Sequence, residues 1–230
     1  MNSKSIYVIG DVHGCYKTLL ALVKKLPKNA KICFVGDLID RGKDSSKVLK
    51  FIRKNRYDSV LGNHEYFMIE AAPNIVKNIN KISDYKWTQK AGGIETLKSY
   101  SQKSQILDDV EYLKSLPLYI EYKDIKTKDG RYLVVSHSSV ENKWKYKDYE
   151  KDTKEYKKFQ ETLLFSRYKN YDNKDIFNIY GHTPTTEAII KNFRAQIDLG
   201  CCYQKESGLN PRLCAIEFPS MKIITQENIE

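Results

Sequence analysis

Short apolar runs along the chain end, one after another, at small polar turns. Residues 6–9, 32–35, 59–61, 132–135 and 176–180 are rich in isoleucine, valine and other β-forming residues, and they predict strands. Each run is followed by a glycine or serine and then by an aspartate, asparagine or histidine. Loops beyond the carboxyl ends of strands converge at one edge of an α/β sheet, so the pattern predicts a shared site there.

Between these runs, apolar residues recur at helical spacing. The alternation of strand and helix indicates an α/β fold with a largely parallel portion. Proline is expected to end two of the helices, the one over residues 65–72 at Pro73 and the one over residues 106–116 at Pro117. The predicted helices cover residues 19–26, 44–52, 65–72, 94–100 and 106–116.

The last part of the chain has a different pattern. Residues 195–199, 213–218 and 223–225 predict successive strands, which we expect to be antiparallel. Two sheets packed face to face, with helices outside, would accommodate both halves in a single domain of residues 1–230. Residues 142–158 are rich in Lys, Tyr, Asp and Glu, and a solvated helix is favoured there over a flap beside the site.

The composition indicates the character of the surface, the compartment and the expected partners. The formal net charge is +10, from 39 Lys and Arg against 29 Asp and Glu. Because the lysines are scattered, a solvated surface is favoured over attraction to phosphoproteins, nucleotides or RNA, and nucleic acid is not an expected partner. Five cysteines without a C-x-x-C pair suit reduced thiols in a cytoplasmic protein. No signal peptide and no apolar run of roughly 18–20 residues is seen, so no membrane partner is expected.

All four histidines of the chain lie in the polar boxes that follow strands. Histidine, aspartate and asparagine supply nitrogen and oxygen ligands for divalent metals. Each box alone is as typical of a turn or a helix start as of a metal site, but their joint recurrence favours a two-metal hydrolase. The boxes are GDVHG at 10–14, GDLIDRG at 36–42, GNHE at 62–65, SHS at 136–138 and GHTP at 181–184.

Two neighbouring metal positions are expected. The ligands are side chains of the boxes: Asp11, His13 and Asp37 for the first position, and Asn63, His137 and His182 for the second. If Asp37 bridges, the two ions lie about 3.5–4 Å apart, and a hydroxide held between them attacks phosphorus in line. Oxygen-rich sites with imidazole ligands accept Mn, Fe, Zn or Mg.

Four further residues suit catalysis and phosphate binding. His64 follows the Asn63 ligand directly, and a hydrogen bond from its imidazole to Asp40 would fix its tautomer and raise its pKa. His64 would then protonate the leaving alkoxide. Arg41 offers a rigid fork for phosphate oxygens, and Arg167 is a second cation from farther along the chain.

Taken together, the boxes resemble those of the calcineurin-like metallophosphoesterases. More narrowly they are similar to the PPP-type serine/threonine protein phosphatases of bacteria and phages, such as that of bacteriophage lambda. The resemblance covers nearly the whole chain and includes Trp87 to Gly93 and Ile197 to Gly200. It implies a four-layer α/β/β/α sandwich of two mixed sheets flanked by helices, with a dinuclear metal site at strand carboxyl ends. It also implies the residue roles given above, with Mn²⁺ as the expected metal.

Three departures from the phosphatase pattern bear on the substrate. Leu61 stands where the phosphatases carry an arginine, so one phosphate-binding cation is missing or comes from elsewhere. Ser138 and Ser139 follow the strand-end histidine, where the family has Ala-Gly. Ala91 replaces an asparagine before the paired glycines.

The favoured activity is that of a phosphomonoesterase acting on phosphoproteins. The alternative is a symmetrical diadenosine-tetraphosphate hydrolase with a nucleotide substrate, because Leu61 and Cys201-Cys202 resemble that sister group. Asp40 and the GHTP box favour the phosphatase. A non-catalytic phosphate-binding module is a third interpretation, and only Leu61 suggests it.

Overall fold

The strand β1 (Ile6–Ile9) lies in the middle of the first of two five-stranded sheets. The structure is a computed structural model that describes residues 5–167, 173–204 and 208–230. It pairs in parallel with β2 and antiparallel with β9, and the sheet has the order β10-β9-β1-β2-β3. The other strands of this sheet are β2 (Ile32–Phe34), β3 (Asp58–Ser59), β9 (Arg212–Phe218) and β10 (Lys222–Glu227).

The second sheet has the order β4-β5-β6-β8-β7. Its three central strands, β5, β6 and β8, are mutually parallel, and the edge strands β4 and β7 run antiparallel to their neighbours. Both sheets are therefore mixed. The strands are β4 (Tyr119–Lys126), β5 (Tyr132–Ser136), β6 (Ile176–Tyr180), β7 (Ile189–Lys191) and β8 (Arg194–Gln196).

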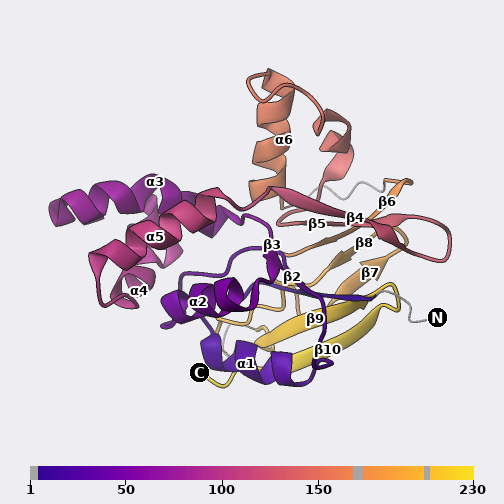
Figure 1. The fold of residues 1–230 in the computed structure, drawn as a ribbon, viewed down its shortest axis with the longest axis horizontal. Coiled ribbons are helices and arrows are strands. Elements are labelled where there is room, and N and C mark those ends of the chain that lie inside the picture. The colour runs from indigo at the N-terminus through magenta and orange to yellow at the C-terminus, as the bar shows by residue number, and fades with distance from the viewer. Residues whose placement is uncertain (1–4, 168–172, 205–207) are drawn as a thin grey trace.

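Most helices lie against the first sheet, whereas α6 stands on the far side of the second sheet (Figure 1). The first group consists of α1 (Tyr16–Lys24), α2 (Ser45–Asn55), α3 (Asn63–Lys77), a 3-10 helix η1 (Ile79–Asp84), a short π-helix η2 (Trp87–Ala91), α4 (Gly93–Lys98) and α5 (Lys103–Lys114). The second group consists of a 3-10 helix η3 (Glu141–Tyr146) and α6 (Lys154–Phe165).

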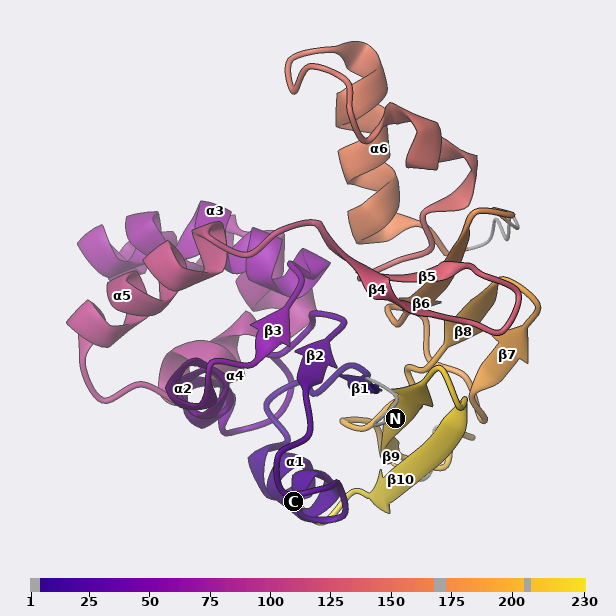
Figure 2. The same ribbon diagram turned by 45° about the vertical axis from the view of Figure 1, so that its right-hand side comes forward.

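Alternating side chains along β1 divide the core into layers. Tyr7 and Ile9 belong to the core under the helices of the first group, whereas Ile6 and Val8 belong to the core between the two sheets. A third core joins the far face of the second sheet to α6 and η3. The layers are thus helix, sheet, sheet and helix, which Figure 2 shows from a second direction. This confirms the expected four-layer α/β/β/α sandwich.

Two helical expectations were wrong. The helix α3 continues through Pro73 to Lys77, because the flanking Ala72 and Ile75 are buried in the core, and this packing offsets the roughly 3 kcal/mol that an internal proline costs. No single solvated helix covers residues 142–158 either. Instead Trp144 of η3 and Phe159 of α6 pack together against the second sheet.

The three tail strands were expected to be successive and antiparallel, and this was wrong in part. The strands β9 and β10 do pair antiparallel, but β8 joins the second sheet beside β6. The short edge strand β7 and the longer β4 lie in stretches for which no strand was predicted. Pairing partners that lie far away in the chain decide these assignments.

The parallel strands of both sheets bring their carboxyl ends toward the same region. In the first sheet, β1, β2 and β3 lead into the boxes at Asp11, Asp37 and Asn63. In the second sheet, β5 and β6 lead into His137 and His182. The predicted convergence of the boxes is therefore a consequence of strand direction.

All five cysteines lie in the described part of the chain. All five cysteines are free thiols, and four of them are buried. Within the ranges 5–167, 173–204 and 208–230, none of the helices combines the length and apolar character that a membrane crossing requires.

Candidate active site

The site is built on strained backbone. Five residues of the boxes, none of them glycine, have left-handed backbone angles: His13 (φ 47°), Asp37 (φ 48°), Asp40 (φ 73°), Arg41 (φ 66°) and His182 (φ 71°). Such conformations cost of order 1–3 kcal/mol each and persist only where the surrounding structure imposes them. Their concentration in these loops marks the loops as functional.

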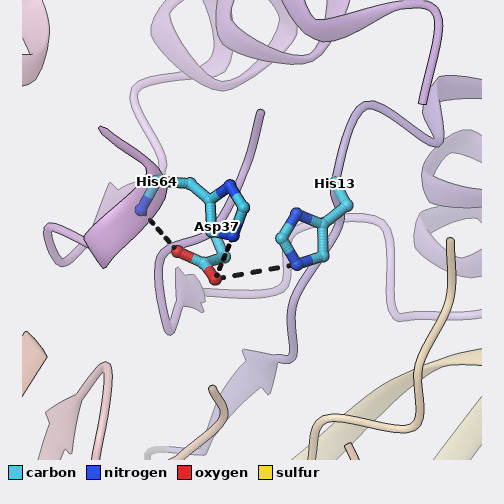
Figure 3. A group of neighbouring side chains, drawn as sticks. All are labelled: His13, Asp37 and His64. Atoms are coloured by element: carbon cyan, nitrogen blue, oxygen red, sulfur yellow. Dashed lines mark hydrogen bonds and ion pairs between the residues drawn. The ribbon is translucent and has the colours of Figure 1, made fainter. Parts of the chain in front are cut away.

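Asp37 lies at the centre of the predicted ligands. One carboxylate oxygen, Oδ2, lies 3.6 Å from Nε2 of His13 and 3.8 Å from Nε2 of His64. Figure 3 draws both contacts as dashed lines. The other oxygen, Oδ1, lies 3.4 Å from Nε2 of His137. Asp37 is therefore the residue common to both groups of donor atoms that could hold a metal ion, His13–Asp37–His64 and Asp37–His137–His182.

The second group gathers imidazole nitrogens and an amide oxygen. Nε2 of His137 lies 2.8 Å from Oδ1 of Asn63 and 3.0 Å from Nδ1 of His182. Two imidazole nitrogens this close can share at most one proton, and a cation would satisfy both lone pairs. Nε2 of His182 is buried and has no hydrogen-bond partner among the described residues.

Backbone carbonyls orient two of the imidazoles. Nδ1 of His13 donates to the carbonyl oxygen of Ile39, and Nδ1 of His137 donates to that of Val35, each at 2.9 Å. A carbonyl only accepts, so Nε2 of each ring keeps its lone pair for a metal. Burial lowers the pKa values of both histidines, which keeps the rings neutral, as ligation requires.

Repulsion between buried carboxylates also favours the binding of a cation at this site. Burial raises the pKa of Asp11, and the nearby Asp198 and Asp37 carboxylates raise it further. Asp11 accepts hydrogen bonds from the amide of His182 at 3.2 and 3.1 Å, so it lies beside the second group rather than within either one. Divalent cations relieve this kind of like-charge repulsion. The donor set, with its mixture of carboxylate, imidazole and amide, fits such ions.

His64 is held differently from the other histidines. Its Nδ1 lies 2.6 Å from Oδ2 of Asp40, and its Nε2 points toward Asp37. Burial tends to lower the pKa of His64, but the Asp37 and Asp40 carboxylates outweigh that effect and raise the pKa above its ordinary value. A protonated imidazole donates a proton and does not ligate a metal, so the environment favours the predicted acid role.

Three side chains, those of His64, Trp87 and Thr96, form hydrogen bonds with the carboxylate of Asp40. It is fully buried and accepts hydrogen bonds from Nε1 of Trp87 at 2.8 and 3.0 Å and from Oγ1 of Thr96 at 2.6 Å. The paired glycines make this possible: a Cβ at Gly93 would lie 2.5 Å from the Trp87 ring. The Trp…Gly-Gly segment therefore positions the partner of His64.

The two predicted phosphate-binding arginines are placed differently. Arg41 reaches across the site, with one guanidinium nitrogen 3.0 Å from Nε2 of His13 and the other 3.3 Å from Nε2 of His64. It also lies over the ring of Tyr203, 5.3 Å from the centroid. Arg167 is exposed just beyond α6. Burial lowers the pKa of His182 to about 3, and the charges of His137 and Arg167 contribute to that shift.

A match to a family model identifies the protein family of the chain. The model of the family described as calcineurin-like phosphoesterase matches residues 4–210. The chain belongs to the calcineurin-like phosphoesterases. Members of this family act as hydrolases with divalent metals, which agrees with the donor groups around Asp37.

Among similar calcineurin-like phosphoesterases, nucleotide hydrolases are prominent. The asymmetrical bis(5'-nucleosyl)-tetraphosphatase PrpE of Oceanobacillus iheyensis is 27% identical over 247 residues, covering 96% of this chain and 91% of the relative. The symmetrical bis(5'-nucleosyl)-tetraphosphatase of Erwinia tasmaniensis is 28% identical over 145 residues, covering 61% of this chain. The match spans only about half of that relative, 46% of its length.

Solved structures show the same fold in proteins of several descriptions. A candidate diadenosine tetraphosphatase superimposes with a TM-score of 0.66 at 18% identity, covering 100% of this chain and 96% of the other. A protein serine/threonine phosphatase from Saccharomyces cerevisiae superimposes with a TM-score of 0.62 at 17% identity, covering 99% and 81%. At these identities the likeness concerns the fold alone.

Two buried carboxylates of the site were not among the predicted functional residues. Asp198 follows β8, accepts a hydrogen bond from the amide of Gly200 at 2.8 Å, and burial raises its pKa to about 6. Glu65 accepts from the amides of Asp37 and Leu38 at 2.8 Å and of Gly62 at 3.0 Å. Its place in the GNHE box was a signal for Glu65, and a position just after a strand was a signal for Asp198.

Replacing Glu65 by glutamine will destabilise the loop that carries Asp37. A glutamine amide presents N–H groups to backbone N–H groups that need acceptors, and leaving such donors unpaired costs about 3 kcal/mol. Denaturant unfolding should show this loss in the free energy of unfolding. The matched control is Glu70→Gln on the exposed face of the same helix, which should leave stability unchanged. Equal stability of both variants would show that Glu65 does not hold the loop.

Proposed function

We propose that this calcineurin-like phosphoesterase hydrolyses a phosphoanhydride bond of bis(5'-nucleosyl) tetraphosphates. The observation that carries the proposal is the match to an asymmetrical bis(5'-nucleosyl)-tetraphosphatase along 96% of this chain and 91% of the relative. Leu61 agrees with it, because an arginine expected of the protein phosphatases is absent there. The comparisons thus favour the nucleotide alternative over the phosphoprotein substrate that ranked first on sequence alone.

The proposed ligand roles are those that the resemblance implies, and the position of Asp37 in both donor groups supports them. Asp11, His13 and Asp37 would hold one divalent ion, and Asp37, Asn63, His137 and His182 would hold a second. Bound metal ions of this kind supply positive charge to phosphoryl oxygens and lower the pKa of a water molecule. Asn63 contributes its amide oxygen without adding a negative charge near an anionic substrate. Mn²⁺ is the proposed ion for activity, among Mn, Fe, Zn and Mg.

The remaining polar residues would act on the substrate directly. Arg41 presents two guanidinium nitrogens toward the middle of the site, the fork geometry that suits phosphate oxygens. Arg167 would add positive charge from the opposite sheet. Nε2 of His64 would donate a proton, or a hydrogen bond, to the oxygen that leaves phosphorus. Asp40 keeps that imidazole oriented and protonated.

A phosphomonoesterase acting on phosphoprotein remains the second candidate. The pairing of His64 with Asp40 at 2.6 Å favours it, because a serine alkoxide is a much poorer leaving group than a phosphate and needs a proton donor. The narrower resemblance to PPP-type phosphatases stays a prediction.

Product analysis tests the proposed reaction. With Mn²⁺ and diadenosine tetraphosphate, water adds to phosphorus at one anhydride bridge and the bridging oxygen leaves with the other nucleotide. We expect ATP and AMP, since the whole-length relative is named as asymmetrical. Two ADP molecules would instead indicate the symmetrical reaction. Chelation should reduce turnover to background, and added Mn²⁺ should restore it.

The same assay separates the competing interpretations. Phosphate release from a phosphopeptide without turnover of the dinucleotide would overturn the proposal in favour of the phosphatase. Metal binding without turnover of either substrate would favour the non-catalytic phosphate-binding module.

A further inference from the structure

Three aromatic rings lie together beside His64. Tyr66 and Phe67 follow it on α3, and Phe165 is the last residue of α6. Phe165 lies 5.7 Å from Phe67 and 6.2 Å from Tyr66 between ring centroids, and Phe67 lies 6.4 Å from the imidazole of His64. We call Tyr66, Phe67 and Phe165 the aromatic shelf.

The shelf does not serve as an ordinary core. Phe67 packs on the core under the first sheet, but Tyr66 and Phe165 belong to none of the three cores. Phe165 is 36% exposed, and the other two rings are half-buried. An aromatic ring left open to solvent beside a catalytic site loses the stability that burial would provide, which suggests that it serves binding.

The end of α6 is tied to the loop of His137, so the shelf has a fixed place. The amide of Ser138 donates to the carbonyl oxygen of Leu163 at 2.8 Å. The hydroxyl of Ser166 donates to Oε1 of Glu141. Arg167 follows immediately, and its positive charge contributes to lowering the pKa values of His137 and His182. The shelf therefore joins the end of α3 that carries His64 to the end of α6 that precedes Arg167.

From this placement we propose that the aromatic shelf stacks a nucleobase of the substrate, on the side of the nucleotide that leaves. The inference rests on the proposed function, since it concerns the substrate of the same site. In the proposed function His64 donates to the leaving oxygen, so a ring next to His64 would meet the group attached to that oxygen. Aromatic side chains accept any base through its π-face. An aromatic ring of a phosphopeptide is the competing occupant, and the experiment below separates the two.

Replacing Phe165 by leucine tests the shelf, because leucine keeps an apolar side chain but removes the flat ring. We expect KM for diadenosine tetraphosphate to rise about tenfold with little change in kcat, the result of losing one base stack that binds ground state and transition state alike. KM for inorganic tetraphosphate, which has no base, should stay unchanged. The matched control is Tyr149→Leu, since Tyr149 is 48% exposed and its ring makes an edge-on contact with that of Tyr146, in the segment before α6.

A binding measurement gives a second readout that does not depend on turnover. Equilibrium dialysis of AMP should show affinity lowered about tenfold in Phe165→Leu and unchanged in Tyr149→Leu. Phe165→Trp should keep or improve the affinity, because it retains a ring.

The outcomes distinguish the shelf from the proposed function. If the wild type turns over diadenosine tetraphosphate and Phe165→Leu leaves both KM and AMP affinity unchanged, the shelf proposal fails and the proposed function stands. If the wild type does not turn over the dinucleotide, the proposed function fails. An effect of Phe165→Leu on KM for a phosphotyrosine peptide, with none on AMP binding, would assign the shelf to peptides and overturn the nucleobase proposal.

Discussion

Replacing Asp37 by asparagine should lower turnover by on the order of 10³-fold and reduce the amount of bound metal. The reason is position: its two oxygens lie 3.6 Å from His13, 3.8 Å from His64 and 3.4 Å from His137, so both candidate metal groups depend on it. An amide has one acceptor oxygen and no charge, so it cannot serve both groups. Metal analysis of the purified variant, together with initial rates at saturating Mn²⁺, measures the two effects.

The control for Asp37 removes an equal charge elsewhere. Asp108→Asn changes an exposed carboxylate on α5 and should keep the metal content and the rate of the wild type. A folded Asp37→Asn variant that keeps two metal ions and full turnover would show that Asp37 does not join the two positions.

Replacing His64 by asparagine should lower kcat by roughly 10²- to 10⁴-fold for an alkyl phosphate monoester while the metal content stays nearly unchanged. The neutral amide cannot protonate the leaving alkoxide, and His64 contributes no ligand in the proposed assignment. The loss should be smaller for diadenosine tetraphosphate, because a departing phosphate is a weaker base than an alkoxide and needs less help from an acid. Rates for both substrates, measured with metal content on one preparation, give the comparison.

Asp40→Asn provides the matched partner for the His64 variant. Asp40 is buried and lies 2.6 Å from Nδ1 of His64, so its loss should reduce the rate in the same direction but by less. If His64→Asn instead emptied a metal position, His64 would be a ligand and its role as an acid would be wrong.

The predictable part of the site came from patterns that repeat locally. Each predicted ligand lies in a box that follows an apolar run, and a strand end is a local feature of sequence. The packing of α6 was not predictable in this way. Residues 142–165 are rich in charge, and only the nearby second sheet explains why Trp144 and Phe159 are buried. The continuation of α3 past Pro73 has the same origin, because neighbouring helices bury its far end.

The amino-acid sequence alone specifies which side chains can carry the chemistry, in the boxes at Asp11, Asp37, Asn63, His137 and His182, and the alternation of strands and helices in an α/β fold. The tertiary structure decided which atoms meet. It placed Asp37 between both groups, turned Nε2 of His13 and His137 inward through backbone carbonyls, and brought Phe165 beside His64. The physical reason is that ligand character belongs to a single residue, whereas distances and proton positions depend on segments that lie far apart in the chain.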